Sequence, residues 1–259
     1  MEHKLEDRVT KLTVTRDGTK IISGGWSGSI MVWDVETHKL VKEWTHPESG
    51  PVLAISPDDR LLAVGHWNVD IYSMEGRHAD SIEVGDSIWS MCFSPDGNKL
   101  ACGNVSSIRV YDVNCGRLIL GPLDAGWVPD VLWSRDGSRL FGSLGRTIRC
   151  WNSDTGQQIG DPWTGHTGTI CSLSLSPDGT ILASASWDEI VRFWNATTGD
   201  PIGQHLHRVS AVRFSPSGEF VASVRGGRKI CLWQVVTRLE QCQISNFEYV
   251  FPVARSAMI

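Results

Sequence analysis

The sequence predicts an all-β propeller of six blades, each built from four antiparallel strands. Two observations lead to this prediction. A four-residue turn signal recurs six times at intervals of 38–42 residues, and an aromatic residue follows each copy after 15–17 residues. A period of this length holds about four short strands and shows no helical pattern, which is typical of a propeller blade.

The recurrent turn is rich in proline, aspartate and glycine. Proline presets φ near −65° at the first central position, aspartate bonds to its own backbone, and glycine adopts the left-handed conformation at little cost. The copies occupy residues 15–18, 56–59, 94–97, 134–137, 176–179 and 215–218. Each copy is therefore expected to join two antiparallel strands.

The second landmark is an aromatic residue followed by a polar one, at the end of a run of alternating or β-branched residues. Such runs are typical of half-buried strands. The six pairs are Trp33-Asp34, Tyr72-Ser73, Tyr111-Asp112, Trp151-Asn152, Trp194-Asn195 and Trp233-Gln234.

The chain is expected to form a single propeller. Its repeats are placed at about 9–45, 46–84, 85–123, 124–163, 164–204 and 205–245, with a C-terminal tail at 246–259. The first strand is expected at 9–14, and residues 240–245 are expected to supply the last strand of the sixth blade. The alternative is seven sheets with a partial last blade.

Composition restricts the kinds of partner. A net charge of −5 and a pI near 5.9 argue against nucleic acid, because phosphate binding needs a basic face. The polar N-terminal residues lack the apolar core of a signal peptide, and no apolar run reaches the ~18 residues that span a membrane. Seven cysteines without a C-x-x-C pair indicate neither a zinc site nor a disulfide framework. A soluble, cytoplasmic protein is expected.

The repeats resemble the WD40 family. Repeat 5 is similar to an ideal family repeat from Gly165-His166 through Trp194-Asn195 to Thr198-Gly199. Its amino-acid sequence also resembles the WD40 arrays of large fungal signalling proteins of the NACHT-WD40 type. The resemblance covers roughly residues 9–245. It implies the propeller fold, whereas function is only weakly implied because one fold hosts many functions.

The resemblance also implies a structural tetrad of histidine, serine or threonine, aspartate and tryptophan in each blade. Repeat 5 has the full set, namely His166, Ser184, Asp188 and Trp194. The other repeats are incomplete: Ser27 stands in the aspartate position of repeat 1, and Val64 stands in the serine position of repeat 2. We expect those five blades to be held mainly by apolar packing between sheets.

Repeat register places tryptophans and arginines in the loops at one face of the propeller. These residue types dominate binding hot spots, and exposed indoles carry a cost unless a partner covers them. The predicted binding surface consists of Trp26, Trp67, Trp89, Trp127, Trp187, Arg146, Arg225 and Arg228. The alternative for each indole is packing over a neighbouring loop.

Motifs typical of enzymes are absent from the sequence, which contains no G-x-S-x-G elbow, P-loop or H-E-x-x-H. We therefore expect no catalytic residues, no metal site and no cofactor. His66 beside Trp67, with Asp70 close by, is the one unusual polar cluster at the rim. The expected function is a non-catalytic scaffold that binds a protein or peptide. The alternatives are a small-molecule or carbohydrate binder that uses the rim tryptophans and, third, an enzyme.

Overall fold

The computed structural model describes residues 7–124, 126–207, 211–225, 229–238 and 241–252. The chain divides into two compact units, one formed by residues 1–133 and 153–156 and the other by residues 134–152 and 157–259. Every regular element in the described ranges is a β-strand. Within them, no helix is long and apolar enough to cross a membrane.

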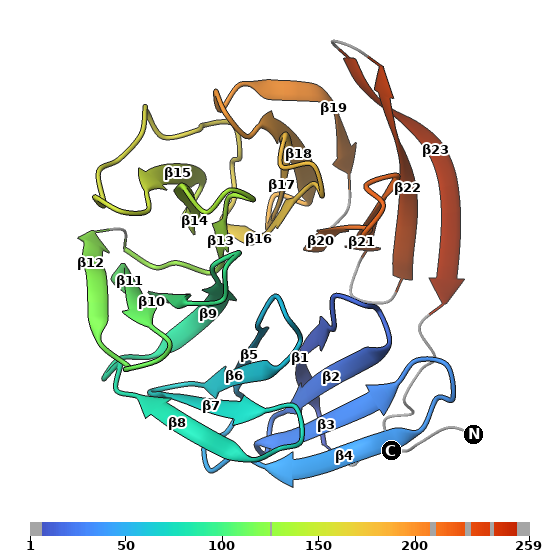
Figure 1. Ribbon diagram of the computed structural model, residues 1–259. Helices are drawn as coiled ribbons and strands as arrows, with labels where there is room; N and C mark the ends of the chain where they lie inside the picture. Colours follow the sequence, from blue (N-terminus) through green and yellow to red (C-terminus); the bar gives the residue numbers. More distant parts are fainter. Residues whose placement is uncertain (1–6, 125, 208–210, 226–228, 239–240, 253–259) are drawn as a thin grey trace. The chain divides into compact units, whose positions relative to one another are not determined.

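The first unit contains three sheets of four antiparallel strands, each with its strands in chain order (Figure 1). The first sheet has β1 (Val9–Val14), β2 (Lys20–Gly25), β3 (Ser29–Asp34) and β4 (Leu40–Thr45). The second has β5 (Val52–Ile55), β6 (Leu61–Gly65), β7 (Val69–Ser73) and β8 (His78–Ile82). The third has β9 (Ile88–Phe93), β10 (Lys99–Asn104), β11 (Ser107–Asp112) and β12 (Leu118–Asp124).

The remaining strands form the fourth, fifth and sixth sheets. The fourth has three strands, β13 (Val131–Trp133), β14 (Arg139–Leu144) and β15 (Thr147–Asn152). The fifth has β16 (Ile170–Leu175), β17 (Ile181–Ser186), β18 (Ile190–Asn195) and β19 (Pro201–His207). The sixth has β20 (Ala211–Phe214), β21 (Phe220–Arg225), β22 (Lys229–Arg238) and β23 (Gln241–Pro252).

Six sheets in the described part of the chain confirm the six-bladed, all-β propeller class. The sixth sheet takes all four of its strands from the C-terminal part of the chain, β20 to β23. Its last strand, β23, continues without a break to Pro252. Residues 246–252, which the sequence placed in a tail, are therefore part of this sheet.

The fourth sheet departs from the expected four strands because its outer segment is interrupted. Only two isolated bridges replace a continuous strand, Ile148 with Trp163 and Trp151 with Gln158. Between the two bridges the chain passes through Gly160, which has a φ of 67°, and then a proline. A residue with a positive φ departs from the extended conformation of a strand, and the interruption coincides with it.

The six recurrent turns form as the sequence predicts. In each one, the N–H of the fourth residue donates to the carbonyl of the first, at 2.9–3.0 Å. The fourth residue has a positive φ in every copy, and it is glycine in all but the second, where Asp59 has a φ of 58°. The Asp59 carboxylate also accepts the N–H groups of Arg16 and Asp17 in the preceding turn. This aspartate thus links two turns of the first unit.

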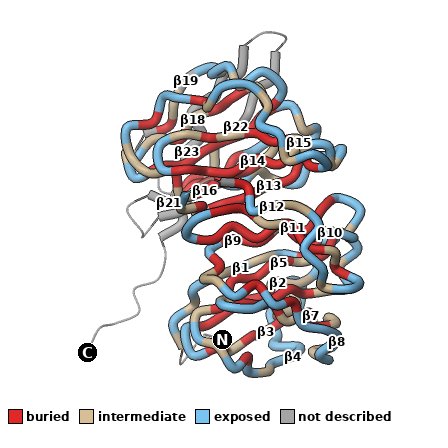
Figure 2. Tube along the Cα trace, turned by 90° about the vertical axis from the view of Figure 1, so that its left-hand side faces the viewer, coloured by how far each residue is buried: buried red, intermediate tan, exposed pale blue. Residues whose placement is uncertain are grey.

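The core lies between neighbouring sheets, and the second strand of each sheet contributes many of its buried residues. β17 is buried along its whole length, whereas every residue of β4 is exposed except Trp44, which is half-buried. Figure 2 shows the same contrast along the trace: β14 is largely buried, whereas β4 and many connecting loops are exposed. In the first unit, Ile30 of β3 and Leu62 of β6 share one apolar cluster. Apolar burial between sheets therefore holds the turns and loops in place.

Replacing Gly18 by alanine tests the backbone requirement of the turn. Gly18 has a φ of 71°, and no atom lies within 4 Å of the point that a Cβ would occupy, so the cost arises from conformation alone. We expect a loss of about 1 kcal/mol of stability, measured as the urea midpoint. Gly18→Asn should lose less, because asparagine adopts this region more readily. Equal losses in both variants would contradict the conformational explanation.

Candidate functional site

Hydrogen bonds hold the loops of the first unit at one end of its strands. In each, a carbonyl at the end of the second strand of a sheet, or in the turn that follows it, accepts from an N–H at the entry to the next sheet. The carbonyl–N–H pairs are Trp26–Gly50 at 2.9 Å, His66–Ile88 at 2.6 Å and Asn104–Val128 at 3.0 Å. These bonds bring the turns and the entry loops to a common end of the first unit. We call it the tryptophan end, after Trp26, Trp67, Trp89 and Trp127.

Three indoles at the tryptophan end are open to solvent. Trp26, Trp67 and Trp89 expose 61%, 53% and 46% of their surface. Trp127 is half-buried, and its ring meets that of Trp89 edge to face, with centroids 5.8 Å apart. The first unit therefore brings four of the predicted residues to one end. Trp127 is the only one of the four that is not exposed.

The other predicted residues belong to the second unit. Trp187 is 64% exposed and lies in the turn between β17 and β18. Its backbone N–H donates to the Thr169 carbonyl at 2.8 Å. Arg146 is exposed in the turn between β14 and β15. Arg225 ends β21, but its side chain lies outside the described part of the chain, as does Arg228.

In the fifth sheet, His166, Ser184, Asp188 and Trp194 form one continuous set of hydrogen bonds. His166 Nδ1 lies 2.9 Å from Asp188 Oδ2, and His166 Nε2 lies 2.8 Å from Ser184 Oγ. Trp194 Nε1 donates to the same Ser184 oxygen at 2.8 Å. Because a carboxylate only accepts, the assigned proton of a neutral His166 is on Nδ1, and Nε2 accepts from the serine. Each of these groups therefore has a partner.

The charge states of the pair follow from burial and hydrogen bonding. Burial lowers the pKa of His166 below its ordinary value, despite the nearby carboxylate. Burial opposes the ionisation of Asp188, but hydrogen bonds from the Thr167 N–H and His166 outweigh it and lower its pKa. At neutral pH the histidine is neutral and the aspartate is charged, which is the state that the hydrogen bonds require.

A hydrolase triad is a poor interpretation of this serine, histidine and aspartate. A catalytic serine must reach substrate, yet Ser184 is 0% exposed. Its oxygen also accepts the indole N–H of Trp194. The set satisfies buried polar groups and has no access for a reacting molecule.

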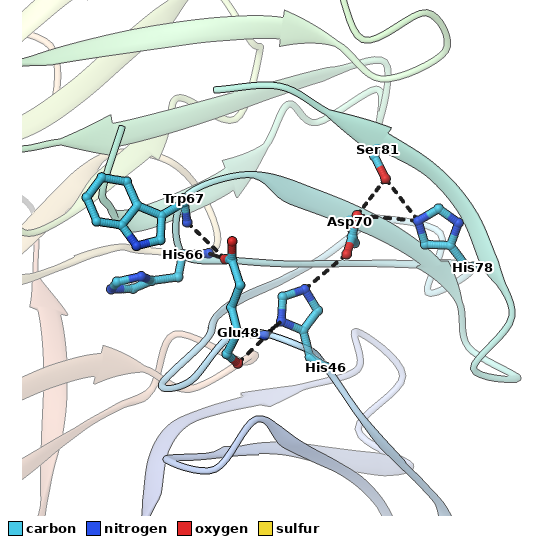
Figure 3. A network of polar contacts seen from close by, with 7 residues as sticks. All are labelled: His46, Glu48, His66, Trp67, Asp70, His78 and Ser81. Carbon is cyan, nitrogen blue, oxygen red and sulfur yellow. Dashed lines mark hydrogen bonds and ion pairs between the residues drawn. The ribbon is translucent and has the colours of Figure 1, made fainter. Parts of the chain in front are cut away.

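In the second sheet, the histidine at the corresponding position, His46, has other hydrogen-bond partners than His166 has in the fifth (Figure 3). His46 Nε2 lies 3.1 Å from Asp70 Oδ2. Asp70 stands directly opposite Val64 in the register of β6 and β7, so the carboxylate comes from the strand next to the one with the missing serine. The other oxygen, Oδ1, accepts from Ser81 Oγ at 2.6 Å and lies 3.3 Å from His78 Nε2.

A glutamate connects this network to Trp67. Glu48 N–H donates to His46 Nδ1 at 3.1 Å, which leaves the His46 proton on Nε2, facing Asp70. The Glu48 carboxylate oxygen Oε2 accepts the N–H groups of His66 and Trp67 at 3.1 and 3.0 Å. Figure 3 shows this carboxylate beside the backbone of the turn that carries both rings. Glu48 therefore fixes the backbone on which the exposed indole stands.

The structure does not bring His66 and Asp70 together as the sequence predicts for the polar cluster around His66. The His66 ring packs edge to face on Trp67, with centroids 5.8 Å apart, while Asp70 bonds to His46, His78 and Ser81. Sequence reasoning missed Glu48, which lies 18 residues before His66. Its only sequence signal is a carboxylate in the loop entering the second sheet. In the described ranges, no group of three or more histidine, cysteine, aspartate or glutamate residues could hold a metal ion.

Polar contacts also hold the first and third sheets. Asp7 Oδ2 accepts from Ser27 N, Ser27 Oγ and Ser29 Oγ, and thus supplies the carboxylate that Ser27 lacks. In the third sheet, Arg109 donates to the Val84 carbonyl of the entering loop at 3.1 Å. In these sheets, polar contacts from other residues hold the same loops in addition to the apolar packing that the sequence predicts.

Ser184→Ala tests the hydrogen-bonded set of the fifth sheet. The change leaves the Trp194 N–H and His166 Nε2 without their buried partner, which costs about 1–3 kcal/mol. The urea midpoint at pH 7.5 measures the loss. Ser49→Ala is the control, since Ser49 is exposed and its hydroxyl bonds to no residue in the described ranges. A loss no larger than that of the control would contradict the assignment.

The lowered pKa of His166 predicts how stability depends on pH. The unfolded chain, with an ordinary histidine pKa of 6.5, binds the proton more readily than the folded chain. Stability from this group is therefore complete above about pH 6.5 and falls as the pH drops from there towards the folded pKa. The urea midpoint of wild type should fall more between pH 7.5 and 5.5 than that of His166→Gln. Parallel pH profiles would show that His166 does not cause the loss.

The chain resembles several characterised proteins along much of its length. It is 25% identical over 270 residues to Protein HIR1 of Candida albicans, covering 95% of this chain and 24% of that protein. It is 27% identical over 245 residues to the anaphase-promoting complex subunit cdc20 of Dictyostelium discoideum, covering 73% of this chain and 49% of that protein. The chain thus spans a quarter to a half of these relatives.

A solved structure supports the same fold. The structure of U3-55K matches with a TM-score of 0.80 at 21% identity, covering 97% of this chain and 83% of that one. The family model described as "WD domain, G-beta repeat" matches residues 1–34, 79–112, 116–152, 157–195 and 201–234. Residues 35–78, which include most of the second sheet, lie outside these five matches. Since the matches cover more than half of the sequence, the chain belongs to the WD40 repeat family.

Proposed function

We propose that the chain is a non-catalytic platform that binds a protein or peptide through the tryptophan end. The observation that carries this proposal is the exposure of Trp26, Trp67 and Trp89 at one end of a single unit. Exposed aromatic surface is unfavourable in water, and aromatic residues dominate the binding energy of interfaces. A partner that covers these rings supplies the missing burial.

A relative supports the same class of function. The Dictyostelium protein is named as a subunit of the anaphase-promoting complex, so a chain of similar sequence works there inside a larger assembly. In this chain, Trp187 and Arg146 of the second unit are also exposed. We propose them as a separate binding surface of that unit, together with Arg225 and Arg228 from the sequence prediction.

The surroundings of Trp67 favour a protein partner over a sugar or small molecule. A ligand of that kind needs a concave site with an aromatic wall. The cavity beside Trp67, of about 250 Å³, has no tryptophan in its lining. We also propose a cytoplasmic location, because the irregular cysteine spacing indicates no disulfide framework and such frameworks are typical of oxidising compartments.

Alanine substitution of the exposed indoles tests the platform. Wild-type protein is used as bait, bound proteins are identified by mass spectrometry, and affinity for the recovered partner is then measured. Trp67→Ala and Trp89→Ala should each weaken binding by about tenfold or more, as truncated hot-spot residues do.

The matched control is Val41→Ala, because Val41 is 55% exposed on β4, away from the tryptophan end. A glycan array run in parallel tests the carbohydrate alternative. Unchanged partner affinity in both tryptophan variants would refute the proposed surface, and tryptophan-dependent glycan binding would favour the alternative.

A further inference from the structure

His46 is a buried histidine whose two ring nitrogens both form hydrogen bonds (Figure 3). Its surface is 2% exposed. The Nε2–H donates to Asp70 Oδ2 at 3.1 Å, and Nδ1 accepts the backbone N–H of Glu48 at 3.1 Å. Since Nε2 already carries the proton of the neutral ring, a second proton can bind only at Nδ1. That nitrogen is the acceptor of the Glu48 hydrogen bond.

The hydrogen bond from Glu48 N–H to Nδ1 is lost when the ring is protonated. A backbone N–H only donates, and a protonated Nδ1 also only donates. The carbonyl oxygen of Glu48 lies 3.4 Å from the same nitrogen and can accept from it. The contact then reverses, from Glu48 N–H to Nδ1 into Nδ1–H to Glu48 O. This reversal requires the backbone of Glu48 to shift.

The fifth sheet has no such conflict. There the unprotonated nitrogen of His166 faces the Ser184 hydroxyl, a group that both donates and accepts. The hydroxyl can turn its proton away when the ring gains one. In the second sheet, Val64 stands in the serine position, and the ring faces a backbone N–H that cannot become an acceptor.

Glu48 connects this hydrogen bond to the exposed indole. Its carboxylate oxygen Oε2 accepts the backbone N–H groups of His66 and Trp67 at 3.1 and 3.0 Å. The backbone of Glu48 thus contacts the buried ring, and its side chain holds the turn that carries Trp67. A shift of the Glu48 backbone therefore changes how this turn is held.

The titratable groups around His46 come from four elements. They are Asp70 and Tyr72 on β7, His78 on β8, Glu48 in its own loop and Glu83 in the loop that enters the third sheet. Burial opposes the ionisation of Asp70, but hydrogen bonds from Ser81 and His78 outweigh it and lower its pKa. Burial raises the pKa of Tyr72, so its hydroxyl stays neutral. Histidine is the side chain that ordinarily changes charge between about pH 5 and 8, so experiments must distinguish His46 from His78.

We propose that His46 is a pH-sensitive switch for the tryptophan end: a proton on Nδ1 breaks the Glu48 hydrogen bond and shifts the Trp67 turn from the position that binds the protein partner. A local change of charge thereby alters an exposed surface. Binding is strongest where His46 is neutral and weakens as the pH falls. This inference rests on the proposed function, since it names how binding at that end is regulated.

NMR of the full chain tests the switch directly. At pH 7.5, the nitrogen signals of the His46 ring should show a proton on Nε2 and none on Nδ1. As the pH falls to 5.5, the backbone amide signals of Glu48, His66 and Trp67 should change in step with this ring. A neutral ring with its proton on Nδ1 would overturn the proposal, as would amide signals that do not follow the ring.

Three variants assign the change to His46. His46→Asn keeps an oxygen acceptor for Glu48 N–H and cannot titrate, so the Glu48 and Trp67 amide signals should lose their pH dependence. His66→Gln removes the ring that packs on Trp67, and His78→Gln removes the second ring on Asp70. Both should retain the dependence.

A pH dependence that persists in folded His46→Asn, or disappears in either control variant, would refute the switch. Circular dichroism at both pH values checks that each protein is folded. Should His46→Asn not fold, the ring signals of wild type and the two control variants still decide the outcome.

Affinity for the recovered protein partner separates the switch from the platform. Wild type should bind several-fold more weakly at pH 5.5 than at pH 7.5, whereas His46→Asn should bind equally at both. If Trp67→Ala weakens binding but His46→Asn keeps the pH dependence, the platform stands and the switch is wrong. If Trp67→Ala leaves the affinity unchanged, the Trp67 surface fails and this inference fails with it.

Discussion

Buried or half-buried polar contacts fix the loops that enter the second, third and fifth sheets, and the exposed surface depends on these contacts. In the fifth sheet the contact is the set around His166 and Ser184. In the second it is His46 with Asp70, and in the third it is Arg109 with the Val84 carbonyl. Once the loop is fixed, its next residues can donate to the turn of the preceding sheet. Trp26 and Trp67 are presented from turns held in this way.

The sequence was sufficient for the fold because its signal is repeated. Six turns and six terminal aromatics at a near-constant period specify the strands without any long-range information, and β1 begins and ends where the pattern predicts. The exception in the fourth sheet is a local interruption of its outer segment, near Gly160 with its positive φ. A repeat pattern averages over such local breaks, so the missing strand was not foreseen.

The candidate site was only partly predictable. Register alone indicated that Trp26, Trp67, Trp89 and Trp127 share one end, but the burial of Trp127 against Trp89 depends on side-chain packing. The network around Asp70 was harder to foresee, because its partners come from three places: the entering loop, β7 and β8. Val64 marked the loss of a serine in that sheet. Nothing in its position showed that a carboxylate opposite it contacts the histidine instead.

The two buried histidines carry their protons on opposite nitrogens, and this limits how freely the repeats can be exchanged. His166 donates from Nδ1, whereas His46 donates from Nε2 and accepts at Nδ1. The substitution Val64→Ser, which copies the serine of the fifth repeat, would therefore not restore a family tetrad. The imidazole would have to change tautomer, and Asp70 and the Glu48 backbone N–H would each lose their hydrogen bond to His46. Consensus design, which treats repeats as interchangeable copies, would thus erase the features by which this blade differs from its neighbours.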